Sequence, residues 1–405
     1  MKWETCKLGS IATCIQPGPF GSQLHNSDYS AEGTPIIMPK DMVNGRIVHS
    51  GLIRIGEDHV IRLNRHQVHQ GNIMVARKGD VRKCVYITEN EDGWMTGSDC
   101  LKVALDENRC FPKYIFYQLR SPHIGKWLET ISIGATMPSI NTGLLSGIEV
   151  SLPPIEAQIK IADILSAYDD LIENNQKQIK LLEEAAQRLY KEWFVDLRFP
   201  GYETAKIVDG VPEGWAYVKA SDAIAFNPKT HLSKDRIKEF VPMSALSTTS
   251  TVLNRADFTE TQANSGAKFK NNDTLLARIT PCLENGKTAF VSGLRSDEGA
   301  IGSTEFIVMR SKMLNPYMTY LYATTDQFRQ TAINSMTGSD GRQRAQVSKL
   351  EAIDFLLPRK ELIDRFAFVV APMFSKIYTL CNQNAGLSQS RDRLLPKLMS
   401  GELEV

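Results

Sequence analysis

The sequence predicts an α+β fold: two pseudo-symmetric globular units with mixed sheets, separated by two long helices packed as an antiparallel coiled coil. Three observations predict this fold. Motifs of the first half return in the second half, each half closes on a strand-like run ended by proline, and a stretch of helical composition follows each half. We expect four segments, with boundaries at residues 1–154, 155–198, 199–358 and 359–405.

The internal repeat is the basis of the two-unit prediction. Residues 72–77 (NIMVAR) return as 273–278 (DTLLAR), and residues 148–153 (IEVSLP) return as 353–358 (IDFLLP). Further matches keep the same order: Gly97-Ser98 with Gly302-Ser303, Val103 with Val308, Pro112 with Pro316, Gly134 with Gly338, and Trp3 with Trp215. Matching positions lie about 200 residues apart, far more than the repeat length of a solenoid, so we expect a duplicated globular unit.

Strand and helix signals alternate within the first unit. Residues 73–76, 84–87 and 101–104 are short β-prone runs separated by glycine-containing turns. Pro112 begins a predicted helix, because proline is tolerated in a first helical turn. The alternation of residues 148–152 predicts a half-buried strand that ends at the following prolines.

Two helical segments follow the globular units. Residues 155–194 contain no glycine or proline, and both segments show a four-three seam. The seam positions are Tyr168, Ile172, Asn175, Ile179, Leu182, Ala186, Leu189 and Trp193, and then Met373, Ile377, Leu380, Asn384, Leu387, Arg391, Leu394 and Leu398. An asparagine on each seam favours one register. Gly386 and Pro396 predict that the second helix is shorter or kinked. The alternative is two amphipathic helices packed on separate cores.

Composition and charge restrict the classes of function. A net charge of +1 argues against a protein that grips duplex DNA by itself through phosphate contacts. We find neither an apolar run long enough for a membrane span nor a secretory leader, so we expect a cytoplasmic protein with no membrane contact. The seven cysteines are scattered and predict buried free thiols rather than disulfides. His66 and His69 have no second ligand pair, so we expect solvated loop residues and no metal.

The junction between the first unit and its helix resembles a known family. A strand leads into Leu152-Pro153-Pro154-Ile155-Glu156-Ala157-Gln158, and Asn141 lies just upstream. This junction is similar to that of specificity (S) subunits of type I restriction-modification systems. Pro19-Phe20-Gly21-Ser22 and residues 338–344 are similar to stretches of that family's target-recognition domains. The second junction, Leu357-Pro358-Arg359-Lys360-Glu361, lacks the second proline and the Glu-Gln pair.

The resemblance implies a function and a set of partners. Each globular unit would be a target-recognition domain that reads one half of a bipartite, asymmetric site on double-stranded DNA. The helices would set the spacing between the halves and dock two methyltransferase (M) subunits, with restriction (R) subunits in the full complex. No cofactor is expected in this chain; S-adenosylmethionine, ATP and Mg are expected only in partner subunits.

Catalytic motifs are incomplete, which favours a subunit that is not catalytic by itself. Asn315-Pro316-Tyr317 lacks the second proline of an adenine methyltransferase motif, and Gly286-Lys287-Thr288 lacks the upstream glycine of a phosphate-binding loop. Two alternatives remain open: a freestanding sequence-specific DNA-binding regulator, which would bind tightly without partners, and a protein-scaffolding module unrelated to DNA.

Three polar loops offer side chains that can read bases, because Arg, Lys, Asn and Gln match the base edges. The first loop spans residues 20–26, the second follows the first repeated strand and has a counterpart at Arg278, and the third spans residues 339–346. The candidate DNA-binding residues are Ser22, Gln23, Asn26, Arg77, Lys78, Arg82, Lys83, Arg278, Ser339, Arg342, Gln343, Arg344 and Gln346. The candidate spacer and partner positions are Ile172, Ile179, Leu182, Leu189, Trp193, Leu380, Leu387, Leu394 and Leu398. For each loop, the alternative is a solvated surface or a local salt bridge.

Overall fold

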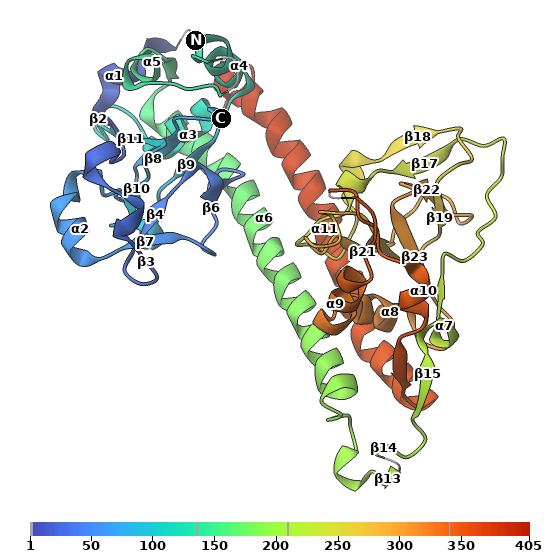
Figure 1. The fold of residues 1–405 in the computed structure, drawn as a ribbon. Helices are drawn as coiled ribbons and strands as arrows, with labels where there is room; N and C mark the ends of the chain where they lie inside the picture. Colours follow the sequence, from blue (N-terminus) through green and yellow to red (C-terminus); the bar gives the residue numbers. More distant parts are fainter. Residues whose placement is uncertain (1–2, 135–136, 209, 340) are drawn as a thin grey trace. The chain divides into compact units, whose positions relative to one another are not determined.

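The computed structural model describes the whole chain except residues 1–2, 135–136, 209 and 340, and the side chain of Ser22. The chain forms two compact units (Figure 1), one made of Met1–Leu171 with Gly386–Val405 and the other of Ile172–Ala385. Each unit contains sheets, short helices and a part of both long helices. The predicted α+β class is confirmed. The division into four segments stays a prediction.

The first unit is built around two four-stranded sheets. One has the order β2-β11-β8-β9 and the other β10-β4-β7-β3, while β1 pairs with β12 and β5 with β6. The strands are β1 (Glu4–Lys7), β2 (Ala12–Pro17), β3 (Tyr29–Ser30), β4 (Thr34–Ile37), β5 (Met42–Val43), β6 (Arg46–Ile47), β7 (Ile53–Ile55), β8 (Ile73–Ala76), β9 (Cys84–Tyr86), β10 (Met95–Thr96), β11 (Cys100–Leu105) and β12 (Glu149–Leu152). The helices are α1 (Leu8–Ile11), α2 (Glu57–Arg62), α3 (Pro112–Leu119), α4 (Pro122–Ile131) and α5 (Thr142–Ser146). The predicted strands, and the helix that begins at Pro112, are confirmed.

The second unit repeats this framework. Its sheets have the orders β16-β23-β20-β21 and β18-β17-β22-β19, and β15 pairs with β24 as β1 pairs with β12. The strands are β13 (Ile207–Val208), β14 (Val211–Pro212), β15 (Ala216–Lys219), β16 (Ile224–Phe226), β17 (Lys238–Val241), β18 (Thr259–Thr261), β19 (Ala267–Phe269), β20 (Thr274–Ala277), β21 (Thr288–Phe290), β22 (Ala300–Gly302), β23 (Phe306–Ser311) and β24 (Asp354–Leu357). The helices are α7 (Ala220–Ala223), α8 (Pro316–Ala323), α9 (Asp326–Asn334) and α10 (Val347–Glu351). A parallel pair occurs in each unit, β4 with β10 and β17 with β22, so the sheets are mixed as predicted.

The register of the strands shows that one predicted pair of repeat residues, Val103 with Val308, is misaligned by one position. Ile73 of β8 lies opposite Val103, whereas the equivalent Thr274 of β20 lies opposite Met309. The counterpart of Val103 is therefore Met309 rather than Val308. The first four residues of both β11 and β23 are buried, Lys102 included, so burial does not alternate along either strand and cannot distinguish neighbouring registers.

The two long helices are α6 (Ile155–Tyr190), followed by a π-helical turn at Lys191–Val195, and α11 (Lys360–Ser400). The expectation of a shorter second helix is wrong, because α11 has 41 residues against 36 in α6 and runs uninterrupted through Gly386 and Pro396. Relative to alanine, a glycine in a helix interior costs about 1 kcal/mol and a proline about 3 kcal/mol. The burial of Leu395, Leu398 and Met399 in the core of the first unit offsets these costs.

The seams pair as predicted where the helices cross the second unit. The side chain of Asn175 donates a hydrogen bond to that of Asn384 at 2.9 Å, and Ile179 shares a buried cluster with Ile377 and Leu380. Residue numbers rise along α6 as they fall along α11, so the helices are antiparallel. The alternative, in which the helices pack on separate globular cores, describes the C-terminal ends of the two helical segments. There, Trp193 packs in the core of the second unit and Leu398 in the core of the first.

Cysteine and histidine environments agree only in part with expectation. All seven cysteines are free, but only Cys84, Cys100 and Cys110 are buried and the others are half-buried. His69 is exposed as expected. His66 is buried instead: its ring contacts the carbonyl of Pro17 and the side chain of Gln16, and burial lowers its pKa. Among the described residues, no helix combines the length and apolarity that a membrane crossing requires.

Candidate nucleic-acid interface

In the first unit, the structure brings two of the predicted loops together at Arg77. This residue directly follows β8, where its N–H donates to the carbonyl of Asp99 at 2.7 Å and its carbonyl accepts from Ile140 at 2.9 Å. Its guanidinium carbon lies 5.4 Å from the centroid of the Phe20 ring. A cation over an aromatic face is attracted by the ring quadrupole. The loop after β2 and the loop after β8 therefore present one basic and aromatic surface.

The neighbouring basic residues already have partners within the unit. Lys78 forms an ion pair with Asp99 at 3.2 Å, and the ammonium group of Lys83 donates to the carbonyl of Pro39 at 3.2 Å. Arg82 pairs with Asp80 and with Glu129, and the hydrogen bond that its guanidinium donates to the Asp80 carboxylate raises the pKa of Arg82. To contact DNA, these side chains would have to share or exchange these partners.

The first loop presents backbone as well as side chains. Gln23 ends a 3-10 turn, and its carbonyl accepts a hydrogen bond from the guanidinium of Arg62 at 2.9 Å. Asn26 begins the next 3-10 turn and is exposed. The Ser22 side chain lies outside the described part of the structure. An exposed amide such as that of Asn26 is available to a ligand.

In the second unit, Arg278 occupies the position of Arg77. Its N–H donates to the carbonyl of Glu305 at 2.9 Å, and its carbonyl accepts from Ala345 at 2.8 Å. Arg278 lines a pocket of about 530 Å³ together with Lys229, His231 and Lys268. The described residues that line this pocket include no carboxylate. The pocket is therefore basic.

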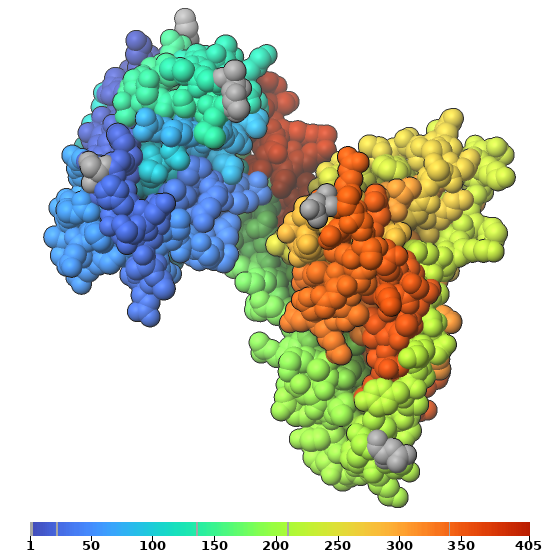
Figure 2. Space-filling view, in the orientation of Figure 1, coloured from blue at the N-terminus to red at the C-terminus, as the bar shows by residue number. Residues whose placement is uncertain are grey.

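The third predicted loop follows Gly338 and runs toward α10. Its orange stretch forms part of the outer surface of the second unit (Figure 2), where Ser339 and Arg342 are exposed. Arg344 forms a forked ion pair with Glu305, 2.7 Å at its shortest, and this contact lowers the pKa of the Glu305 carboxyl. The local salt bridge considered for this loop is therefore present at Arg344.

Two glutamines of the third loop are held by the backbone framework. The carbonyl of Gln343 accepts from the N–H of Thr280 at 3.1 Å. The side chain of Gln346 donates to the hydroxyl of Thr337 at 2.7 Å and to the carbonyl of Arg344 at 3.1 Å. The Gln343 side chain is half-exposed and remains a candidate for contact with bases.

Sequence reasoning missed the first-unit counterpart of this loop. Arg344 forms isolated bridges with Ile279 and Thr337, and Ser139 forms the same pair of bridges with Lys78 and Ile133. The repeat of Gly134 as Gly338 was the signal, since each glycine precedes the bridging residue. Ser139 therefore stands in the first unit where Arg344 stands in the second.

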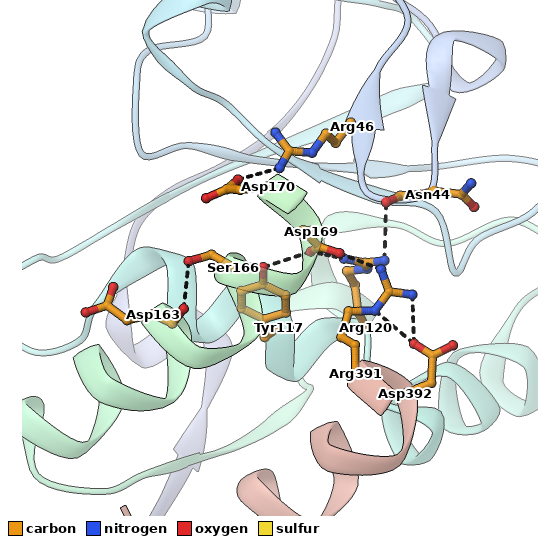
Figure 3. A network of polar contacts seen from close by, with 10 residues as sticks. All are labelled: Asn44, Arg46, Tyr117, Arg120, Asp163, Ser166, Asp169, Asp170, Arg391 and Asp392. Carbon is orange, nitrogen blue, oxygen red and sulfur yellow. Dashed lines mark hydrogen bonds and ion pairs between the residues drawn. The ribbon is translucent and has the colours of Figure 1, made fainter. Parts of the chain in front are cut away.

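A buried polar network attaches α6 and α11 to the core of the first unit (Figure 3). Asp169 of α6 accepts hydrogen bonds from the hydroxyl of Tyr117 on α3 at 2.8 Å and from Arg120, the C-cap residue of α3, at 3.2 Å. Arg391 of α11 pairs with the same carboxylate, which raises the pKa of Arg391 against the opposing effect of burial. One carboxylate therefore connects three helices.

The second unit attaches α6 and α11 differently. Phe374, at the repeat position of Asp169, packs against Phe290, Tyr317 and Tyr320 with ring centroids 4.9 to 5.7 Å apart. Glu183 of α6 accepts from the N–H of Thr251 at 2.7 Å, and burial raises the pKa of this carboxyl. The second attachment is therefore mostly aromatic.

The predicted spacer positions fall into four environments. Ile179, Leu380 and Leu182 form the helix–helix cluster of the second unit, and Ile172 and Leu387 are half-buried. Leu189 and Trp193 pack in the core of the second unit, and Leu394 and Leu398 in that of the first. No group of three potential metal ligands from His, Cys, Asp and Glu occurs among the residues that the structure describes.

Comparisons with known proteins agree with this geometry. Residues 1–184 match the family model of the type I restriction modification DNA specificity domain. The chain is 26% identical over 417 residues to the MjaIX specificity subunit of Methanocaldococcus jannaschii, covering 100% of this chain and 94% of the relative. It is 22% identical over 474 residues to the HindI specificity subunit of Haemophilus influenzae, covering 99% of each. The EcoEI specificity subunit of Escherichia coli is 31% identical over 178 residues, which cover 43% of this chain and 29% of the relative.

A solved structure extends the likeness to the fold. The S subunit of a type I restriction-modification system from M. genitalium superposes with a TM-score of 0.60 at 14% identity, covering 98% of this chain and 96% of that chain. The likeness to this structure concerns the fold, which in this chain consists of two repeated α+β units. These matches confirm the resemblance indicated by the first junction, which is to specificity subunits of type I restriction-modification systems.

Proposed function

We propose that this specificity subunit is non-catalytic and that each globular unit acts as a target-recognition domain for one half of a bipartite, asymmetric DNA site. The observation that supports this is a repeated framework with diverged loops. The antiparallel four-stranded sheet of the first unit, β2-β11-β8-β9, has the same strand order as that of the second unit, β16-β23-β20-β21. Within the loops, equivalent positions hold different residues: Ser139 in the first unit corresponds to Arg344 in the second, and Lys78 corresponds to Ile279.

Two diverged readers on one chain suit an asymmetric site. A palindromic site is read by two identical subunits related by a two-fold axis, whereas diverged loops on a common framework read different half-sites. The net charge of +1 is low for a protein that neutralises many phosphates. Partner subunits that clamp the duplex would add those phosphate contacts.

We assign to the paired helices the spacing between the two half-sites. A buried asparagine pair such as Asn175 with Asn384 favours one register, since a shifted register leaves amide groups unpaired. Both ends of the helix pair are anchored: Asp169 and Arg391 join the first unit, and Trp193 and Phe374 join the second. A fixed register with anchored ends is what a spacer requires.

Docking of two methyltransferase (M) subunits is assigned to a stripe that the two helices repeat. Glu156, Lys160 and Ile164 lie four residues apart on α6, and all three are exposed. The repeat places Glu361, Arg365 and Val369 at the same positions on α11, again exposed. Side chains four residues apart share one helix face. Two identical partners would each use one copy of this stripe.

The remaining partners follow from the family. Relatives of this chain are named as subunits of type I restriction enzymes, so restriction (R) subunits would join the full complex. The chemistry would belong to those partners, with S-adenosylmethionine bound by M and with ATP and Mg used in restriction. The chain itself would supply sequence choice, spacing and docking.

The test is to express the chain with its candidate M subunit and to map adenine methylation by long-read sequencing. We expect a split motif with a fixed gap. Exchange of residues 212–358 for the equivalent segment of another specificity subunit should change only one half of that motif. Methylation without a split motif, or a change in both halves, would contradict the two-reader proposal. Tight sequence-specific binding by the chain alone would favour a freestanding regulator.

A further inference from the structure

Arg77 and Arg278 are the same residue at the same backbone position in two units that otherwise differ at their loops. Each follows the four-residue strand at the interior of its sheet, β8 or β20. Each makes the same two backbone hydrogen bonds, one to the residue before the partner strand and one from the loop that leads to α5 or α10. The equivalence therefore rests on geometry as well as on sequence.

Both guanidinium groups are open to an anion. Neither forms an ion pair with a carboxylate in the part of the chain that the structure describes, whereas Lys78, Arg82 and Arg344 do. Arg77 lies over the exposed ring of Phe20. Arg278 donates one hydrogen bond to the carbonyl of Ala345, and its buried Nε has no partner within the described structure.

The surroundings of Arg278 favour a phosphate. Lys229 and Lys268 line the same pocket, and the described lining includes no carboxylate. The nearby carboxylate of Glu305, whose pKa is lowered first by the hydrogen bond from Arg344 and also by Arg278, is already paired with Arg344. Arginine binds phosphate oxygens through its planar fork, and lysine binds them as a point charge. A pocket of this composition holds a backbone phosphate better than the edge of one particular base.

We propose that Arg77 and Arg278 each bind the sugar-phosphate backbone of their own half-site, so that they contribute affinity and orientation but no base selection. This inference rests on the proposed function of two readers for two different half-sites. Whatever is identical in the two units is suited to what is identical in the two half-sites, which is the phosphate backbone. Base selection is then left to diverged positions, such as Ser139 against Arg344.

The alternative role for these arginines is direct readout of guanine, the commonest specific contact of arginine. The two roles differ in their response to lysine. Lysine retains a phosphate contact as a point charge but loses the two parallel hydrogen bonds to guanine. Arg77→Lys and Arg278→Lys therefore separate the roles, and their small structural change guards against misfolding.

The experiment uses the complex of the chain with its M subunits. Binding to the cognate duplex and to a scrambled duplex is measured across salt concentrations, and the methylated motif is mapped for each variant. For Arg77→Ala or Arg278→Ala, we expect about tenfold weaker binding to both duplexes. The salt slope should fall by about 1 and the motif should stay unchanged. The lysine variants should bind nearly as tightly as the parent.

The control is Arg295→Ala, since Arg295 is an exposed arginine of the second unit already paired with Glu239 and Glu260. An equal loss in this variant would overturn the inference, because the effect would then be one of general charge. A motif that relaxes in one half, or lysine variants as weak as the alanine variants, would also overturn it in favour of base readout. If the parent complex methylates no split motif, the proposed function itself fails.

Discussion

Replacement of Asp169 by alanine should destabilise the first unit and leave the second unchanged. The carboxylate is 10% exposed and holds Arg391 and Arg120, whose side chains are 13% and 17% exposed. Removing one partner of a buried ion pair costs about 3 to 5 kcal/mol, because the other charge stays buried without compensation. The small residual exposure, together with the ion pair that Arg391 keeps with Asp392, places the expected loss at the lower end, about 3 kcal/mol. This corresponds to roughly a hundredfold rise in the opening equilibrium.

Hydrogen exchange followed by mass spectrometry measures this loss unit by unit. Amides of α3, which carries Tyr117 and ends at the C-cap residue Arg120, should exchange roughly a hundredfold faster at conditions where reclosing is faster than exchange, so that the opening equilibrium sets the rate. Amides of α8 in the second unit serve as the internal reference. Asp163→Ala, which removes an exposed carboxylate of the same helix, is the matched control and should have an effect of about 0.5 kcal/mol or less. A loss below about 1 kcal/mol for Asp169→Ala, or equal acceleration in α8, would refute the reasoning.

Three further predictions concern the helices. Burial raises the pKa of Glu183, so its ionised form costs stability at neutral pH and that cost is relieved as the pH falls through the raised pKa. Glu183→Gln keeps an acceptor for Thr251 and should match or exceed the parent's stability at pH 7 while flattening the acid side of the profile, as urea titrations at several pH values would reveal. Ile164→Asp or Val369→Asp should each remove one of two bound M subunits, and native mass spectrometry would count them; retention of both would exclude the stripe as the docking surface. One heptad inserted within residues 168–193, with a matching insertion in the facing stretch of α11, should lengthen the gap of the methylated motif by about three base pairs or abolish function; full activity with an unchanged gap would exclude the spacer role.

Much of the fold was predictable because its signals are local or periodic. The β-prone runs, the proline that begins α3 and the four-three seams all correspond to elements of the structure. The register of β23 was not predictable from residue types, since its first four residues are buried and uniform in hydrophobicity. His66 was mistaken for a solvated residue because its burial depends on Gln16 and Pro17, about 50 positions away in sequence.

The candidate site shows the same division between local and tertiary information. The polar loops were identifiable from their composition, but their pairing partners were not. Arg344 and Lys78 looked available in the sequence, whereas each already pairs with a carboxylate from a distant loop. Ser139 was missed because a serine in a loop does not by itself indicate a DNA-binding position. Only its two bridges show that it is the first-unit equivalent of Arg344.

The two units also differ in the residues that attach them to the long helices, which restricts how a globular unit can be exchanged for that of another protein. At one repeat position, the first unit uses the charged Asp169 and the second uses Phe374. Edge-to-face aromatic contacts need matching ring positions, whereas the carboxylate needs donors from α3 and α11. Exchange of residues 212–358 leaves Phe374 in place, so an incoming segment must supply aromatic rings where Phe290, Tyr317 and Tyr320 stand. We therefore expect a donor segment with polar residues at these positions to fold only when Phe374 is exchanged with it.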